Sequence, residues 1–169
     1  TLKPGEMVQT LDGGAQPIIW AGQSRFEGAR LTEARRPVSI APRALDHAGF
    51  LRLEHGFPDR PLNVSAQHRL LLGGSEVQKM TGAGDVLVPA KGLLELPGVR
   101  LMRGKKSVRY VHLMLPRHGV IWADGIAAES FFPGPQALAA LSPGARGCLR
   151  RLLPGLQQNT HAAYGGFCR

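Results

Sequence analysis

Short apolar runs, each ended after a few residues by Gly, Pro or an Asp-Gly pair, constrain the fold of this chain more than any other feature. Its 169 residues include 22 Gly and 13 Pro, which favour turns because Gly adopts positive φ angles and Pro lacks a backbone N–H. Closely spaced turns favour many short strands over long helices. Because 43% of the residues are hydrophobic, the chain can bury a core. We therefore expect a mainly β fold of short, twisted antiparallel strands.

The first expected hairpin has a turn at Asp12-Gly13, a dipeptide that supplies the positive φ angles of a two-residue turn. This turn separates Met7–Leu11 from Gln16–Gly22. Pro17 should lie near the start of the second strand, where a missing N–H is tolerated.

The remaining apolar runs predict further strands and leave two connections between them. The strands are expected at Val38–Ile40, Leu62–Val64, Arg69–Leu72, Asp85–Pro89, Val108–Leu115, Val120–Ala123 and Ile126–Ala128. The last two flank a second tight turn, Asp124-Gly125. Arg25–Arg36 fits either a loop or a short edge strand, and Pro42–Arg60 fits an extended connection. Ala90–Leu94 fits a single helical turn.

The C-terminal part changes character, because Ala and Leu recur there with helical spacing over Pro135–Leu141 and Ser142–Leu153. Ser142 is a favourable N-cap and Pro143 a favourable first helical residue. We expect one or two short helices. The expected organisation is a β domain over residues 1–134, a helical extension over 135–156 and a flexible tail over 157–169.

The chain is strongly basic, with a net charge of +9 and a pI of about 10.6, which makes nucleic-acid binding a candidate function. The only dense basic cluster consists of Arg100, Arg103, Lys105, Lys106 and Arg109. A solvated turn between strands, with Gly104 at its tip, explains this cluster equally simply. Few aromatic residues lie near it to stack on bases. We therefore keep nucleic-acid binding only as a second alternative.

Other classes of site have little support. No apolar run approaches the roughly 18 residues that a membrane-spanning helix needs, so no membrane span is expected. Cys148 and Cys168 fall in no metal-ligand spacing, and no disulfide between them is predicted. The histidines discussed below also lack a ligand spacing, although imidazole is a common zinc ligand. No metal or cofactor is expected.

The motif Ser65-Ala66-Gln67-His68 lies between two of the expected strands. A histidine three residues after a hydroxyl side chain is a short pattern with a high false-positive rate. By itself, His68 would more readily be read as a core histidine that a backbone carbonyl satisfies. Its importance comes from neighbouring segments that match in the same order along the chain.

These segments together resemble the Hint domain, the Hedgehog/intein autoprocessing module, and in particular its bacterial branch. The matching segments are Leu2-Lys3-Pro4-Gly5-Glu6-Met7-Val8, Gln16-Pro17-Ile18-Ile19-Trp20-Ala21-Gly22, Val64–Arg69, Val86–Lys91, Tyr110–Leu113 and His118 through Phe131. The resemblance extends roughly from Leu2 to Leu153. It implies a horseshoe of short β-strands and a bacterial, secreted or cell-surface setting, although the sequence itself defines no compartment or oligomeric state.

The resemblance also implies a chemistry for the Ser-x-x-His motif. A Hint domain converts the peptide bond before its own first residue, normally Cys, into a thioester. A histidine protonates the departing amide nitrogen, and a hydroxyl three residues earlier polarises the same peptide. These roles fall to His68 and Ser65, with Ser in place of the commoner Thr. The substrate would be the polypeptide that flanks the domain on its own N-terminal side.

Two further histidines are weaker site candidates. His112 stands where splicing relatives usually have Asp, and His118 matches a histidine common in the same block. Each is either structural or assists breakdown of the thioester. A two-residue turn at Pro116-Arg117 would pair His118 with Leu115 and point it away from His112, whereas one bulge residue would reverse that orientation.

Two departures from the family pattern modify the expected function. No Cys lies near Thr1, so we expect the chain as given to lack its nucleophile and to be inactive. No His-Asn pair occurs in Asp124–Ser130, so Asn-driven splicing should be absent. The leading interpretation is thus self-cleavage on the N-terminal side of the domain. The alternative is a degenerate Hint fold that serves as a secretion or interaction module without catalysis.

Overall fold

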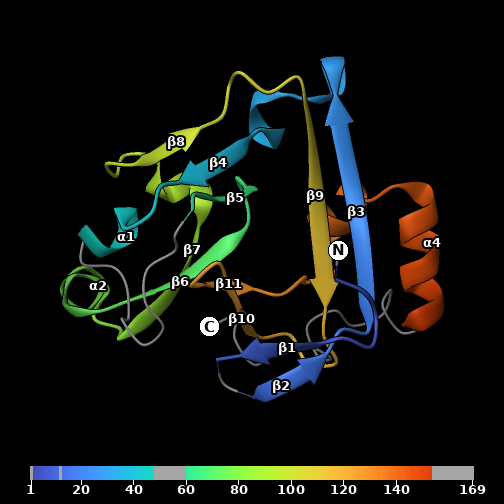
Figure 1. Cartoon of the computed structure of the whole chain (residues 1–169), viewed down its shortest axis with the longest axis horizontal. Helices are drawn as coiled ribbons and strands as arrows, with labels where there is room; N and C mark the ends of the chain where they lie inside the picture. Colours follow the sequence, from blue (N-terminus) through green and yellow to red (C-terminus); the bar gives the residue numbers. More distant parts are fainter. Residues whose placement is uncertain (1, 12, 48–59, 154–169) are drawn as a thin grey trace. The chain divides into compact units, whose positions relative to one another are not determined.

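The structure is a computed structural model that describes residues 2–11, 13–47 and 60–153. These residues form a mainly β fold of antiparallel strands (Figure 1), which confirms the expected fold class. The strands are β1 (Met7–Thr10), β2 (Gly14–Pro17), β3 (Trp20–Glu27), β4 (Pro37–Ile40), β5 (Leu62–Ser65), β6 (Arg69–Gly73), β7 (Asp85–Pro89), β8 (Val99–Leu101), β9 (Ser107–Met114), β10 (Val120–Ala123) and β11 (Ile126–Glu129).

Short helices and 3-10 turns connect the strands. The helices are α1 (Ala44–His47), α2 (Ser75–Thr81), α3 (Pro135–Ala140) and α4 (Pro143–Leu152), and the 3-10 turns are η1 (Gly28–Arg30), η2 (Glu33–Arg35) and η3 (Ala90–Leu93). The expected extended connection Pro42–Arg60 is wrong at its start, because Ala44–His47 is helical; its residues 48–59 lie outside the described residues. The helical turn expected at Ala90–Leu94 is confirmed by η3.

The described chain divides into two compact units that interleave in sequence. The terminal unit contains the described residues within 1–25, 109–121 and 130–153. The central unit contains those within 26–108 and 122–129. Each unit is described below by itself.

The terminal unit begins with the predicted hairpin of β1 and β2, in which Met7 pairs with Pro17 and Thr10 with Gly14. The Thr10 hydroxyl donates to the Gly14 carbonyl (2.7 Å) and accepts from the N–H of Gly13 (3.0 Å). The expected single strand Gln16–Gly22 is wrong, because it divides between β2 and β3.

Pro17 marks the point of division, since it is the last residue of β2 and not near the start of a strand. Ile18 still follows the hairpin register, because its N–H donates to the carbonyl of Glu6, and the change of partner comes at Ile19, whose N–H donates to the carbonyl of Met114 on β9. The hairpin register therefore runs one residue beyond Pro17, and the new pairing with β9 begins at Ile19.

Strand β3 pairs with β9 and alternates between buried and exposed residues, with Trp20, Gly22, Ser24 and Phe26 buried. It extends further than the sequence suggested. The segment Arg25–Arg36, expected as a loop or an edge strand, contains the end of β3 followed by the two 3-10 turns η1 and η2.

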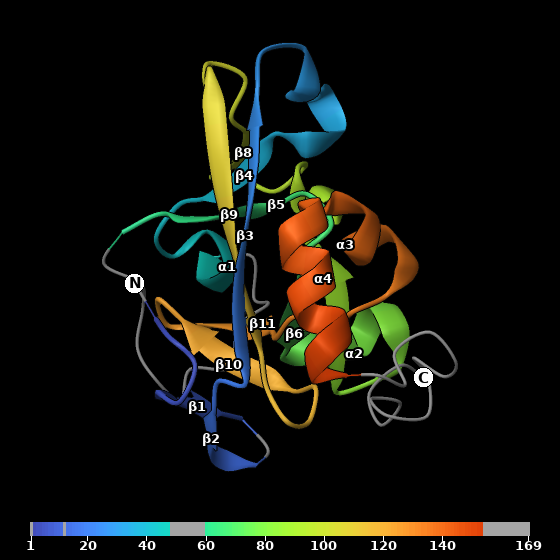
Figure 2. The same ribbon diagram turned by 90° about the vertical axis from the view of Figure 1, so that its right-hand side faces the viewer.

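Helices α3 and α4 pack against this strand pair (Figure 2). The shared core contains Trp20 of β3, Met114 of β9, Phe131, Leu141 and Leu149 of α4. As predicted, the Ser142 hydroxyl caps α4 by accepting from the N–H of Ala145 (3.2 Å), with Pro143 as the first helical residue. The C-terminal helices therefore complete the hydrophobic core of the terminal unit.

The central unit contains two groups of paired strands. One has the order β5-β4-β8, with Val38 opposite both Val64 and Leu101. In the other, β6 pairs with β7 and β11, so that Leu70 faces both Val88 and Ala128. Buried residues from these strands form one core together with α1, α2 and η3.

The second Asp-Gly turn is confirmed in this unit. Asp124 and Gly125 both have positive φ, 47° and 79°, as a type I′ turn between β10 and β11 requires. Arg60 forms an ion pair with the Asp124 carboxylate (2.7 Å), which contributes little because the Arg60 side chain is largely exposed.

Candidate functional site

Ser65 and His68 are the first and last residues of a β-turn in the central unit. The N–H of His68 donates to the carbonyl of Ser65 (3.0 Å), so the turn closes between the end of β5 and the start of β6. Both side chains are half-buried. The sequence motif therefore corresponds to one local backbone structure, with Ser65 and His68 at its two ends.

The 3-10 turn η3 fixes this β-turn from one side. The N–H of Ala90 donates to the carbonyl of His68 (2.8 Å), and the N–H of Lys91 donates to the carbonyl of Ala66 (2.9 Å). Ala66 and Ala90 are both buried. Backbone hydrogen bonds thus hold the turn at three points.

Glu129 supports the same turn from β11, a role that sequence reasoning missed. One carboxylate oxygen, Oε1, accepts from the N–H of Arg69 (3.1 Å), directly after His68. Burial raises the pKa of the Glu129 carboxyl, although this hydrogen bond and the charge of Arg69 oppose the increase. The only sequence signal was that Glu129 lies inside a segment that matches the family.

His112 lies in the terminal unit on β9, opposite β3. Its Nε2 is 3.0 Å from the hydroxyl of Ser24, and its ring lies 5.1 Å from that of Phe131, centroid to centroid. Burial lowers the pKa of His112 from 6.5 to about 4. The imidazole is therefore neutral at neutral pH and keeps one unprotonated nitrogen.

This shift predicts that the protein loses stability in mild acid. Between pH 6.5 and 4 the unfolded His112 binds a proton that the folded form excludes, so the free energy of unfolding falls as the pH falls. The lowering of the pKa from 6.5 to about 4 corresponds to about 3 kcal/mol. We expect His112→Gln to lose this part of the pH dependence in denaturant titrations at pH 7, 5.5 and 4.

The comparison isolates His112, because carboxylates such as Glu129 titrate equally in the wild type and the variant. Above pH 7 the two proteins should show parallel pH dependence. Equal pH dependence of the two proteins between pH 7 and 4 would show that the buried His112 does not exclude a proton.

His118 is buried, with 8% of its surface exposed, and its ring contacts Phe132 edge-on at 5.3 Å. It lies between β9, which ends at Met114, and β10, which begins at Val120. The two-residue turn at Pro116-Arg117 considered from the sequence is therefore wrong. The next residue, Gly119, is tied to Ser130: its N–H donates to the Ser130 hydroxyl (3.1 Å), and its carbonyl accepts from the Ser130 N–H (2.8 Å).

The four candidate residues thus form two pairs. Ser65 and His68 share one turn of the central unit. His112 and His118 belong to the terminal unit, where the consecutive rings of Phe131 and Phe132 contact one imidazole each.

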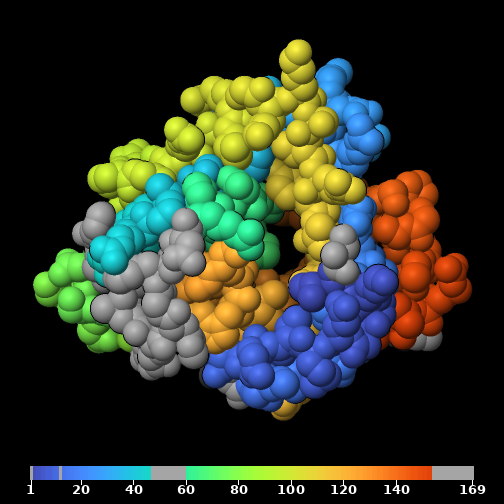
Figure 3. All heavy atoms as spheres, in the orientation of Figure 1, coloured from blue at the N-terminus to red at the C-terminus, as the bar shows by residue number. Residues whose placement is uncertain are grey.

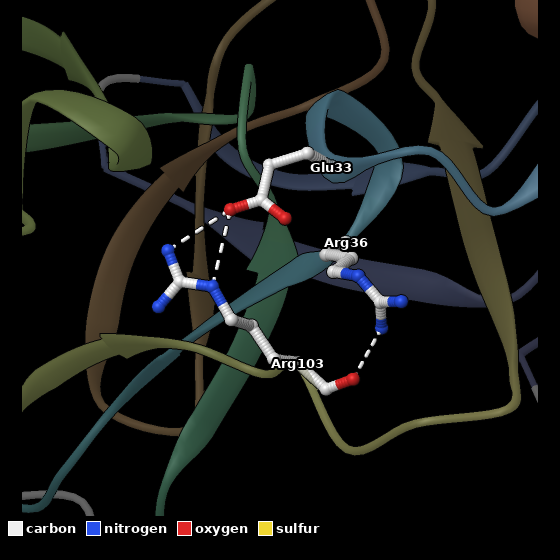
Figure 4. A network of polar contacts seen from close by, with 3 residues as sticks. All are labelled: Glu33, Arg36 and Arg103. Atoms are coloured by element: carbon white, nitrogen blue, oxygen red, sulfur yellow. Dashed lines mark hydrogen bonds and ion pairs between the residues drawn. The ribbon is translucent and has the colours of Figure 1, made fainter.

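The basic cluster takes part in contacts within the protein. Both Nε and Nη2 of Arg103 donate to one carboxylate oxygen of Glu33 (3.2 and 2.9 Å), and Arg36 donates to the carbonyl oxygen of Arg103 (2.6 Å) (Figure 4). Arg36 also donates to the carbonyl oxygen of Lys105 (3.1 Å). The turn between β8 and β9, yellow in Figure 3, lies at the surface, and its residues 103–107 are exposed. The arrangement matches the solvated turn considered from the sequence, and Arg103 of the cluster together with Arg36 from outside it helps to fix the turn.

Among the described residues, no group of three His, Cys, Asp or Glu side chains lies close enough to hold a metal ion. No helix in the described part of the chain is both long and apolar enough to cross a membrane. Cys148 is half-buried on α4, whereas Cys168 lies outside the described residues, as does the predicted tail over 157–169.

These observations define a mainly β domain that presents a hydroxyl and an imidazole from one rigid turn. A family model of the Hint domain matches residues 1–135. The chain therefore belongs to the Hint domain family, as the resemblance of its segments implied. Comparison with curated proteins and with solved structures gives no match.

Proposed function

We propose that this Hint domain is an autoprocessing domain that cleaves the peptide bond on its own N-terminal side through a thioester. The observation that carries this proposal is the closed turn of Ser65 and His68, with its 3.0 Å backbone hydrogen bond and its support from η3. The family match covers this turn.

The first step is an acyl shift from nitrogen to sulfur. The thiol of a cysteine at the start of the domain attacks the carbonyl carbon of the preceding residue, so a C–S bond forms and the C–N bond breaks. His68 gives a proton to the departing nitrogen. The thiol loses one proton as it attacks, so the step as a whole neither gains nor loses a proton. Without this protonation, an amide anion would have to leave, which makes a general acid essential.

We assign to Ser65 the role of polarising the same peptide. The Ser65 side chain is half-buried, and its hydroxyl makes no hydrogen bond within the described part of the chain. It can therefore donate to the carbonyl oxygen on which negative charge develops. Ser65→Thr should retain this function and Ser65→Ala should lose it.

The second step is attack on the thioester by water, which yields a carboxylate and regenerates the thiol. Asn cyclisation is not available, because the segment Asp124–Ser130 contains no His-Asn pair. We assign His112 to this step. With a pKa of about 4 it is a weak base, since an effective general base has a pKa near the working pH. Its lone pair suits it to orient the attacking water by accepting a hydrogen bond.

The test is to express the gene product from its own start codon and to follow its mass by intact mass spectrometry. We expect cleavage at the N-terminal boundary of the domain, faster when a small thiol is added. Ser65→Ala should slow cleavage by about 10²- to 10³-fold, as the loss of one such donor does elsewhere, and Ser65→Thr should restore most of it.

A protein that begins at Thr1 provides the negative control, because it contains no upstream peptide to cleave. If the gene product stays intact under thiol while its circular dichroism shows a folded domain, the proposal fails. That result would favour the alternative of a Hint fold that serves as an interaction module without catalysis.

A further inference from the structure

The family match ends at residue 135, where α3 begins. The helical extension nevertheless belongs to the core of the terminal unit, because Leu141 and Leu149 are buried against Trp20 and Met114. Met114 lies on β9, two residues after His112. The extension therefore packs on the strand that carries a proposed site residue.

Ser24 connects the extension to His112 directly. It lies on β3 with only 3% of its surface exposed. Its hydroxyl lies 3.1 Å from the carbonyl oxygen of Ala140, the last residue of α3, and 3.0 Å from Nε2 of His112. The Ala140 carbonyl is one of those at a helix end that lack a partner within the helix.

The chemistry of these three groups fixes the direction of both hydrogen bonds. A carbonyl oxygen can only accept, so the single proton of the Ser24 hydroxyl points to Ala140. The Ser24 oxygen then accepts from His112, which must carry its proton on Nε2. In a neutral imidazole this leaves Nδ1 as the unprotonated nitrogen.

Phe131 packs against the same imidazole ring. The two ring planes meet at 57° with centroids 5.1 Å apart, a tilted packing that restricts rotation of the imidazole. Phe131 is itself fixed, because its N–H donates to the carbonyl of Leu113 (2.7 Å), next to His112 in the chain. The hydrogen bond to Ser24 thus selects between orientations of a ring that is already confined.

We propose that Ser24 is a positioning residue through which the C-terminal helical extension holds His112 in a single orientation, with the proton on Nε2 and with Nδ1 as the acceptor. This inference rests on the proposed function only where it concerns thioester breakdown. The orientation and the tautomer of His112 follow from the structure of the terminal unit alone. The extension, outside the matched region, then orients one of the proposed site residues.

The tautomer is measured by NMR on the full chain with 15N-labelled histidine at pH 7, because the ring 15N shifts distinguish a protonated from an unprotonated nitrogen. We expect the Nε2–H form of His112 in the wild type and a mixture of tautomers in Ser24→Ala. Ser24→Thr, which keeps the hydroxyl, should retain the single form. Ser39→Ala is the matched control, since Ser39 is equally buried but lies on β4 in the central unit.

The wild-type spectrum tests the inference even if Ser24→Ala fails to fold, because a His112 protonated on Nδ1 overturns it outright. An unchanged single tautomer in folded Ser24→Ala also overturns it. The cleavage assay then separates this inference from the proposed function. Loss of one such hydrogen bond should slow thioester breakdown by about threefold to tenfold. An altered tautomer with unchanged thioester breakdown supports the positioning role and refutes the catalytic assignment of His112.

Discussion

Replacing His68 by Ala is expected to slow cleavage at the N-terminal boundary of the domain by about 10²- to 10⁴-fold, the usual contribution of a general acid. The physical reason is the departing amide nitrogen, which leaves only when it is protonated. The turn that begins at Ser65 fixes where the imidazole lies, so no other side chain of the turn can take over this role. The rate is measured by the appearance of the released fragment in intact-mass spectra.

Gln67 provides the matched control for this experiment, because it lies in the same turn but its side chain is exposed. Gln67→Ala should cleave within about twofold of the wild type, an effect well under 1 kcal/mol on the barrier. Both variants should give the same near-ultraviolet circular dichroism as the wild type. If His68→Ala cleaves as fast as Gln67→Ala, His68 is not the acid.

Replacing Gly22 by Ala is expected to destabilise the fold by about 3 kcal/mol, at the upper end for an overpacked core. A Cβ at this position would overlap with the Trp20 indole, at its Cη2 and Cζ2 atoms. Trp20 has no room to withdraw, since it is 3% exposed and packs against Phe131 at 5.3 Å. Either the indole leaves the core of the terminal unit or the β3 backbone shifts.

For a chain of this size, such a loss lowers the midpoint of thermal unfolding by roughly 6–12 °C. Gly104→Ala is the control, because nothing lies within 4 Å of a Cβ at that exposed position. It should stay within about 0.5 kcal/mol of the wild type. A Gly22→Ala protein as stable as Gly104→Ala would show that the indole does not cover Gly22.

Features that depend on residues close in sequence were predicted well. Asp124 and Gly125 form the expected tight turn because the dipeptide itself favours positive φ angles. The capped start of α4 follows in the same way from Ser142 and Pro143. The β-turn from Ser65 to His68 also belongs to this class, because its closing hydrogen bond joins residues only three apart in the chain.

Features that depend on distant partners were missed. Helix α2 was overlooked, since a seven-residue helix between Gly74 and Gly82 gives little periodicity to read. Strand β8 was hidden in a basic segment, although Val99 is buried and the strand pairs with β4. Both elements are stabilised by tertiary packing more than by their own propensity.

The surroundings of His112 show the same limit at the site itself. Strand alternation could not decide whether His112 and His118 point to the same side, because β9 and β10 are joined by five residues and not by a tight turn. No sequence pattern pointed to Ser24, because its partner His112 lies 88 residues away in the chain. Only the packing of β3, β9 and α3 brings these groups together.

The most direct test of autoprocessing is to trap the acyl group with hydroxylamine while the gene product is processed. A thioester transfers its acyl group to hydroxylamine, so the released N-terminal fragment should carry a C-terminal hydroxamate. Mass spectrometry should find this fragment with the wild type and Gln67→Ala, and at least 100-fold less of it at early times with His68→Ala. A fragment that ends only in a free carboxylate at every hydroxylamine concentration, or no fragment at all, would contradict a thioester mechanism.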